Sequence, residues 1–360
     1  MAPPRNAIEA VVHPDPYPYY QQLRRDQPLF FDPGLGLWVA SSHAAVSAAF
    51  ADHRLLVRPP TEPVPRALVG TPVGEVFAML VRMSDGSFHA THKPAVEADA
   101  ARWPASQLAD FSREVTLQLL PHLGINDFLT ALPVRVMARL LGVAPAQLDE
   151  TSRWVHDFTR AIGAGASPEA IAQGCIAAEA LMRQGLVEGL DRVQAANRIG
   201  FMQQSLDATA GLLGNSACLL QSQPDLLGLI TDSDELARAV VSEVARWDAP
   251  VQNTRRFAPE DLTMAGVDIH KGDAVLLVLA SANRDEAFNA EPDVFDALRE
   301  GRRSMTFGVS AHACPGELIA VEIVAACLAS LGLKKDVTQW FGECMGYRAL
   351  PNARVPVFSR

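Results

Sequence analysis

The sequence predicts a mainly α-helical protein that carries a few small β-sheets. Helical periodicity of the apolar residues dominates residues 75–190. A long, nearly uncharged apolar segment follows at 200–220, as expected for a helix buried on several faces. Short β-like runs separated by Gly and Pro turns are concentrated after Pro250. Together these observations favour helices packed around a central helix, with the strands gathered toward one side.

In the N-terminal half, each expected element follows from local pattern and turn chemistry. Apolar and aromatic spacing predicts helices at 19–25, 44–51, 132–141 and 176–193, and Gly142 is suited to end the third of them. The aromatic and β-branched run at 29–41, interrupted by Pro33-Gly34 and Gly36, predicts a hairpin.

The C-terminal half begins with the expected buried helix at 200–220, in which Asp207 is the single charged residue. The later elements are helices at 232–247 and 317–331, short strands at 256–258, 262–265 and 274–279, and a β-like tail. No repeat or low-complexity linker divides the chain. We therefore expect one domain over 1–360, with β-rich portions at about 27–60 and 250–280.

Composition excludes several functional classes. The 360 residues are 49% hydrophobic and 20% charged, which is ordinary for a globular protein able to enclose a cofactor. A net charge of -10 argues against nucleic-acid binding, which needs a concentrated basic face. The five cysteines are scattered without a CxxC pair, which argues against a disulfide framework or a four-cysteine zinc site. No signal peptide or membrane span is expected, so we expect a cytoplasmic protein.

The segment 307–316, Phe-Gly-Val-Ser-Ala-His-Ala-Cys-Pro-Gly, precedes a long apolar helix. A thiolate ligand needs positive potential and hydrogen-bond donors, and a loop that ends at a helix N-terminus supplies both to Cys314. Gly308 and Gly316 allow the backbone to turn tightly around Cys314, and His312 can donate a hydrogen bond to an anionic group beside the loop.

This loop resembles the haem-binding signature of the cytochrome P450 family, Phe-Gly-x-Gly-x-His-x-Cys-x-Gly, with Ser310 in place of the second glycine. The resemblance extends in order along nearly the whole chain. It implies the P450 fold, in which a triangular, prism-like helical part joins a small β region. It also implies haem b as cofactor, with Cys314 as the axial iron ligand and the loop's other matching residues at the cofactor: Phe307, Gly308, His312 and Gly316.

Two further sets of residues match the family. Glu243 and Arg246 form its Glu-x-x-Arg motif, which with Arg299 implies a buried structural network with no catalytic role. His89 and Lys93 match the positions that usually hold a His and, four residues later, an Arg at the haem carboxylates. Lys93 keeps the charge but not the guanidinium fork. Another carboxylate contact is expected from Arg256, with Arg255 as the alternative.

The central helix departs from the family pattern, Ala-Gly-x-(Asp/Glu)-Thr-Thr, whose acid and first Thr relay protons for oxygen activation. One alignment matches Ala210-Gly211 and leaves no acid or alcohol. The other uses the distance to Pro224 and places 204–209 over the motif. We favour the second, because it needs no gap and explains a costly buried acid. The expected catalytic positions are then Asp207, Ala208 in place of the usual Thr, and Thr209.

The resemblance implies a monooxygenase that inserts one oxygen atom from O2 into a small organic substrate, in secondary metabolism or catabolism. Electrons would come from an external ferredoxin and its reductase, which could dock on Arg302-Arg303 and Lys334-Lys335. Substrate contacts are expected from residues 68–77 and from Ser205, Val251, Gln252 and Asn253. Two alternatives stay open: a peroxide-dependent or redox-neutral haem-thiolate enzyme, and a haem-binding sensor or carrier without turnover.

Overall fold

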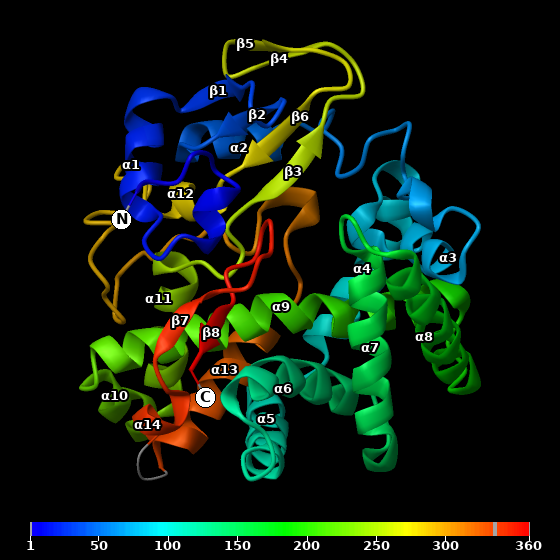
Figure 1. The fold of residues 1–360 in the computed structure, drawn as a ribbon, viewed down its shortest axis with the longest axis vertical. Coiled ribbons are helices and arrows are strands. Elements are labelled where there is room, and N and C mark those ends of the chain that lie inside the picture. The colour runs from blue at the N-terminus through cyan, green and yellow to red at the C-terminus, as the bar shows by residue number, and fades with distance from the viewer. Residues whose placement is uncertain (1, 334–336, 360) are drawn as a thin grey trace.

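The computed structural model describes residues 2–333 and 337–359 (Figure 1). A layer of helices forms the lower part of the view, and most of the strands lie above it with α1 and α2. The sequence-based prediction of a mainly helical fold with small sheets is confirmed.

The helices fall into three groups along the chain. The N-terminal group is α1 (Tyr17–Asp26), α2 (His43–Ala51), α3 (Pro72–Ala78) and α4 (Gly86–Ala101). The central group is α5 (Ala105–Leu119), α6 (Ile125–Leu140), α7 (Leu148–Ile162), α8 (Pro168–Val187) and α9 (Arg192–Ser222). The C-terminal group is α10 (Leu226–Asp232), α11 (Asp234–Trp247), α12 (Leu279–Asn283), α13 (Glu317–Gly332) and α14 (Val337–Phe341).

The main sheet joins distant parts of the chain in the order β1-β2-β6-β3, from β1 (Leu29–Asp32), β2 (Leu37–Ala40), β6 (Ala274–Leu277) and β3 (Thr254–Phe257). The hairpin expected at 29–41 is the antiparallel pair β1 and β2, while β2 and β6 are parallel. Two separate antiparallel pairs are β4 (Leu262–Met264) with β5 (Val267–Ile269), and β7 (Cys344–Tyr347) with β8 (Pro356–Phe358). The strands therefore come from the segments that the sequence indicated.

Two helix boundaries differ from expectation. The single helix predicted at 176–193 is wrong, because α8 ends at Val187 and Gly189 adopts a left-handed φ of 89°. A new helix then begins with a capping box, in which Asp191 accepts from the Gln194 N–H and the Gln194 side chain accepts from the Asp191 N–H. This cap extends the expected central helix backward, so α9 runs 31 residues from Arg192 to Ser222.

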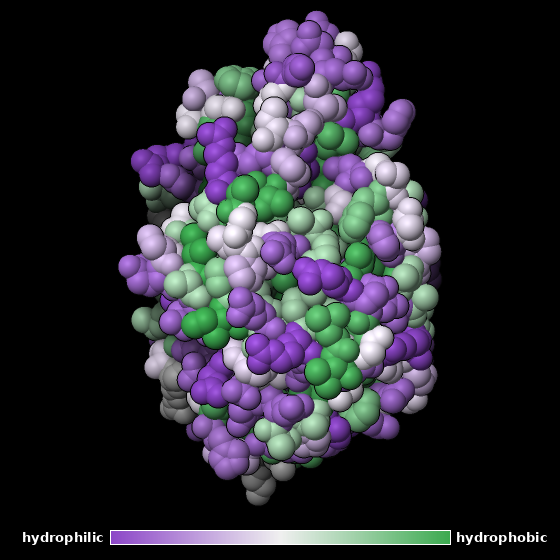
Figure 2. All heavy atoms as spheres, turned by 90° about the vertical axis from the view of Figure 1, so that its right-hand side faces the viewer, coloured by the Kyte–Doolittle hydropathy of each residue, from purple (hydrophilic) through white to green (hydrophobic). Residues whose placement is uncertain are grey.

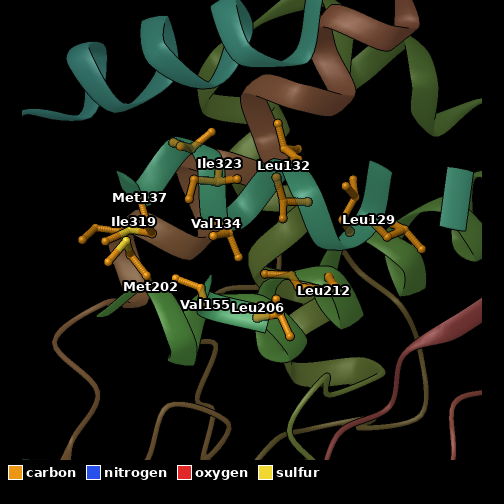
Figure 3. Close-up of a cluster of buried hydrophobic side chains, with 14 of the residues drawn as sticks. Leu129, Leu132, Val134, Met137, Val155, Met202, Leu206, Leu212, Ile319 and Ile323 are labelled. Carbon is orange, nitrogen blue, oxygen red and sulfur yellow. The ribbon is translucent and has the colours of Figure 1, made fainter. Parts of the chain in front are cut away.

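The hydrophobic core lies where α6, α7, α9 and α13 meet. Figure 3 shows apolar side chains from these four helices pointing toward one another, among them Leu132, Val155, Leu206 and Ile323. Because other elements cover α9 on several sides, its apolar residues are spread around the helix and are not confined to one face. The core thus supports both α9 and α13, the helix that follows the cysteine loop.

Hydrophilic side chains cover most of the face shown in Figure 2, and apolar side chains gather there in small patches between them. This is the side of the molecule on which α3, α4, α7 and α8 lie in Figure 1. Within residues 2–333 and 337–359, the helices include none with the length and apolar character required to span a bilayer.

Candidate active site

A cavity of about 840 Å³ lies between α9, the loop before α13, strand β3 and the turn at 348–353. Its apolar wall includes Met137, Leu206, Leu212, Ile319 and Ile323, which are labelled in Figure 3. The cavity therefore borders the core, and its shape depends on the packing of α6, α9 and α13.

Cys314 lies on the cavity wall, held there by its own loop. The Cys314 N–H donates to the carbonyl oxygen of Phe307 over 2.8 Å, and the Gly316 N–H donates to the Cys314 Sγ over 3.4 Å. Gly308 turns the loop with a left-handed φ of 67°. Burial raises the pKa of the Cys314 thiol, and the Gly316 N–H opposes this rise. A thiolate at this place therefore needs a cation beside it, such as a metal ion.

Three of the basic side chains expected at the cofactor line the same cavity: Lys93, Arg256 and His312. The Lys93 Nζ donates to the carbonyl oxygen of Ala313 over 2.7 Å, so α4 is tied to the cysteine loop. The His312 Nε2 lies 3.1 Å from the Asp85 Oδ1. These groups can receive the carboxylates of a bound cofactor close to the thiol.

Strand geometry distinguishes Arg256 from its neighbour Arg255. Alternate residues of β3 point to opposite sides, so Arg256 is buried at the cavity while Arg255 is exposed. The Arg256 guanidinium carbon lies 5.1 Å from the ring centre of Phe50, and burial lowers the pKa of Arg256. The alternative that Arg255 contacts the cofactor is not supported by this placement.

His89 provides an observation that a cofactor explains. Its ring lies 4.2 Å from that of His312, yet its buried Nε2 has no hydrogen-bond partner among the described residues. A buried polar atom without a partner is uncommon and costs free energy. A macrocycle with acidic substituents, placed against Cys314, fits this atom and the basic side chains around it.

The comparisons with known proteins agree with this geometry. The sequence profile described as Cytochrome P450 matches residues 234–331. The chain is 26% identical to 6-deoxyerythronolide B hydroxylase of Saccharopolyspora erythraea, over 91% of this chain and 93% of that protein. It is 27% identical to Epothilone C/D epoxidase of Sorangium cellulosum, over 85% of this chain and 82% of the relative.

Comparison of the folds also finds cytochrome P450 proteins. The structure of epothilone B-bound cytochrome P450epoK matches with a TM-score of 0.81 at 22% identity, over 95% of each chain. In sequence profile and in fold, the chain matches the cytochrome P450 family. P450 proteins bind haem b, iron protoporphyrin IX, so the cofactor and the monooxygenase class expected from the sequence are confirmed. When bound, a thiolate-ligated haem supplies oxygen activation, to which the thiolate contributes electron density.

The α9 residues that the sequence analysis assigned to oxygen activation or substrate contact line the cavity together: Ser205, Asp207, Ala208 and Thr209. The Ser205 hydroxyl donates to the carbonyl oxygen of Met202, so it is occupied within α9. Burial raises the pKa of Asp207, and the positive charge of Arg348 partly offsets the rise. Of the three residues 207–209, Asp207 supplies a carboxyl group and Thr209 a hydroxyl group, whereas Ala208 supplies neither.

Two glycines of α9 lie at a close contact with the C-terminal hairpin. A Cβ on Gly211 would lie 2.6 Å from the carbonyl oxygen of Arg354, and one on Gly214 would lie 2.7 Å from the Cδ of Pro356. Gly211 and Gly214 therefore serve a close contact between helix and hairpin, away from the cavity wall formed by Gln203 to Thr209.

The expected substrate contacts require two corrections. Val251 and Asn253 line the cavity, but Gln252 is fully buried elsewhere, where its Oε1 accepts from the Tyr20 hydroxyl over 2.9 Å. In an extended chain successive side chains point to opposite sides, so the Gln252 side chain points away from the cavity that Val251 and Asn253 line. Residues 68–77 do not line the cavity either, because α3 packs against α8. The part of this connection that reaches the cavity is Val81-Arg82.

The predicted structural network is larger than the sequence indicated. Arg246 donates to both carboxylate oxygens of the fully buried Glu243, over 2.6 and 3.0 Å, and the Arg299 Nε donates to the Glu243 Oε1 over 3.0 Å. Arg302 also donates to Glu243, over 3.0 Å. Arg302 is therefore part of this structural network, and Arg303 is the exposed member of the Arg302-Arg303 pair.

Among the cavity residues that were not expected from the sequence, four are basic: Arg82, His156, Arg160 and Arg348. They come from different elements and match no motif of their own. Arg82 stands three residues before Asp85, the N-cap of α4, and this proximity to the matched His89 was the single available signal.

Proposed function

We propose that this P450 oxidises a small organic substrate held between the Gln203–Thr209 part of α9 and the turn at 348–353. Cys314 is the axial iron ligand in this proposal. His89, Lys93, Arg256 and His312 hold the haem carboxylates. The observation that carries the proposal is the cavity in which Cys314 and these basic groups meet, beside a buried His89 nitrogen that has no protein partner. Val251 and Asn253 then border the substrate.

Proton delivery in this proposal depends on Asp207 and Thr209. Ala208 cannot donate a proton, whereas the Asp207 carboxyl and the Thr209 hydroxyl lie next to it on the same helix and reach the same cavity. Because burial raises the pKa of Asp207, its carboxyl holds a proton more readily than a solvent-exposed acid does. A water or a substrate hydroxyl completes the path where Ala208 leaves space.

The relatives suggest the metabolic setting. The names of several similar proteins describe hydroxylation or epoxidation, as in 6-deoxyerythronolide B hydroxylase and Epothilone C/D epoxidase. We therefore place the reaction of this chain in secondary metabolism.

We also propose a separate ferredoxin and reductase as the electron source, and a cytoplasmic location. Of the residues suggested for docking, Arg303 is exposed, whereas Lys334-Lys335 lie outside the described residues.

A peroxide-dependent reaction is the second candidate, and the absence of a hydroxyl at Ala208 is the observation that favours it. Peroxide already carries the electrons that the first candidate takes from a reductase and the protons that it takes from solvent. Turnover with hydrogen peroxide alone, without ferredoxin, would distinguish this reaction from the first candidate.

The test of the proposed function is the carbon monoxide difference spectrum of the dithionite-reduced protein. We expect a Soret band at about 450 nm, the position typical of thiolate-ligated haem, in the parent protein. Cys314→Ala should lose this band. Cys175→Ala should retain it, because Cys175 lies on α8 outside the cavity. A protein without haem, or a Cys314→Ala protein that keeps the band, would contradict the proposal. Bound haem without product under either electron supply would support the sensor or carrier alternative.

A further inference from the structure

Two cysteines outside the site described above lie on elements that pack against each other. Cys218 belongs to α9, and Cys344 is the first residue of β7. Both side chains are partly exposed, and both are free thiols in this structure. Neither lines the cavity that contains Cys314, so this pair of thiols has no role in the site assigned so far.

The β7–β8 hairpin follows one face of α9. This face carries residues that are three or four positions apart: Gly211, Gly214, Cys218 and Gln221. The chain that forms β8 advances with the helix, from the close contact at Gly211 to the contact of Pro356 with Gly214. Further along the helix, the Gln221 side chain donates to the carbonyl oxygen of Gly342, shortly before β7. Cys218 thus lies between two contacts of α9 with the hairpin.

The register of the hairpin brings Cys344 to the same place. Cys344 pairs with Phe358, which follows Pro356 by two residues of β8. Two residues of a strand advance about 7 Å, and the four residues from Gly214 to Cys218 advance about 6 Å along the helix. Cys344 therefore stands opposite Cys218, and the two thiols form a hydrogen bond.

The surroundings activate one of the two sulfur atoms. The hydrogen bond with Cys218 lowers the pKa of Cys344 to about 6, although partial burial opposes this effect. The charge of Arg354 lowers the pKa of Cys344 further, and the charge of Asp248 acts in the opposite direction. The neutral Cys344 thiol can instead donate to the carbonyl oxygen of Gly346, 3.6 Å away. The pKa of Cys218 is raised by the same thiol pair, so Cys344 is the sulfur that ionises first.

We propose that Cys218 and Cys344 form a reversible disulfide when the protein meets hydrogen peroxide. The Cys344 thiolate attacks one peroxide oxygen, the O–O bond breaks, and Cys344 becomes a sulfenic acid. The hydroxide that leaves takes up the proton that Cys344 released. The Cys218 thiol then attacks the sulfenic sulfur, and its proton leaves with the sulfenic oxygen as a second water. Two thiols and one peroxide thus give one disulfide and two waters, and a dithiol reductant restores both thiols.

The disulfide ties the hairpin to the helix that lines the cavity. The turn at 348–353 follows β7 and supplies part of the cavity wall. A covalent bond at the base of the hairpin therefore limits how far this turn can move from α9. A single reversible pair also suits a reducing compartment, in which disulfides are transient. The inference goes beyond the proposed function and does not depend on it, because the bond can be mapped in a protein whose substrate is unknown.

The experiment begins with haem-loaded protein that has been reduced with dithiothreitol and freed of it. After a small excess of hydrogen peroxide, free thiols are alkylated and tryptic peptides are analysed by mass spectrometry. We expect a disulfide between the peptides that contain Cys218 and Cys344, and its loss when dithiothreitol is added again. A parent protein in which both thiols stay free, or in which Cys344 joins a different cysteine, would overturn the proposal.

Matched variants connect this bond to stability. Compared with equally treated Cys344→Ser, the oxidised parent should have a Tm that is higher by about 3–8 °C, because the bond closes a long loop of the unfolded chain. Cys175→Ser should behave as the parent does, since Cys175 lies on α8. An oxidised parent that carries the bond but melts with Cys344→Ser would contradict the tie between hairpin and helix.

A third variant tests the order of the two steps. Cys218→Ser has no second thiol, so Cys344 should remain a sulfenic acid that dimedone traps. The reverse result, with dimedone on Cys218 in Cys344→Ser and none on Cys344 in Cys218→Ser, would contradict Cys344 as the attacking sulfur.

Discussion

Ser310 adopts a left-handed backbone conformation, with a φ of 64°, in the loop that carries Cys314. Glycine occupies this position in the family signature, because a side chain in this conformation brings its Cβ too close to the carbonyl oxygen. The cost for a residue with a Cβ is about 1–2 kcal/mol. The departure from the family signature at Ser310 is therefore a strained residue in the loop of Cys314.

We predict that Ser310→Gly increases the free energy of unfolding by about 0.5–1 kcal/mol. The gain is smaller than the strain, because glycine also gains freedom in the unfolded chain. Urea unfolding of the two proteins measures the difference. Ala311→Gly is the control, since Ala311 has an ordinary negative φ and should lose stability. Equal losses for both variants would show that Ser310 is unstrained.

The contact between α9 and the β7–β8 hairpin connects the core to the cavity that Cys314 lines. Gly211 and Gly214 allow β8 to lie directly on α9, and Figure 1 shows the hairpin crossing that helix. The turn between the two strands supplies cavity residues, from Arg348 to Ala353. The position of this turn therefore depends on how closely the hairpin approaches the helix.

We predict that Gly211→Ala destabilises the protein by about 1–3 kcal/mol, because the new methyl group would meet backbone that has to shift. Thermal unfolding checks this prediction. Gly228→Ala in α10 is the matched control, since nothing lies within 4 Å of its added Cβ. Alanine there should be neutral or stabilising by up to about 1 kcal/mol, because it is the better helix former. If the two variants were equally stable, the β7–β8 hairpin would be able to move away from α9 without a loss of stability.

For the whole molecule, Arg354 joins the two ends of the chain. Its guanidinium donates to the carbonyl oxygens of Val11, His13 and Pro14 near the N-terminus, over 2.6 to 3.1 Å. The Arg354 Nε also donates to the Asp248 Oδ1, just after α11, over 3.0 Å. One buried side chain thus holds the N-terminal segment, the end of α11 and the hairpin together.

We predict that Arg354→Met costs about 3–5 kcal/mol, because Asp248 and three carbonyl groups lose a charged partner inside the protein. The free energy of unfolding in urea measures this cost, and limited proteolysis should then cut the N-terminal segment first. Arg255→Met, at an exposed arginine of β3, should stay within about 0.5 kcal/mol of the parent. If Arg354→Met and Arg255→Met changed the free energy of unfolding equally little, the hydrogen bonds of Arg354 to the N-terminal segment would not stabilise the protein in solution.

Much of the fold and part of the site could be predicted because their signals are local. The 29–41 hairpin depends on its turn residues, and Gly142 ends α6 with a left-handed φ of 89°. The cysteine loop is also a continuous segment, so its glycines and Cys314 could be recognised together. The bounds of α8 and α9 were less predictable, since the break at Gly189 and the Asp191 cap lie within one apolar pattern.

By itself, the sequence determined the helical class, the cysteine loop and the residues that match the family, because each depends on neighbours within one element. Only the tertiary structure decided that Gln252 faces Tyr20, that Arg302 binds Glu243, and that Arg82 reaches the cavity. The physical reason is that long polar side chains take their partners from elements far apart in the chain. Their direction is therefore set by packing, and not by the residues beside them.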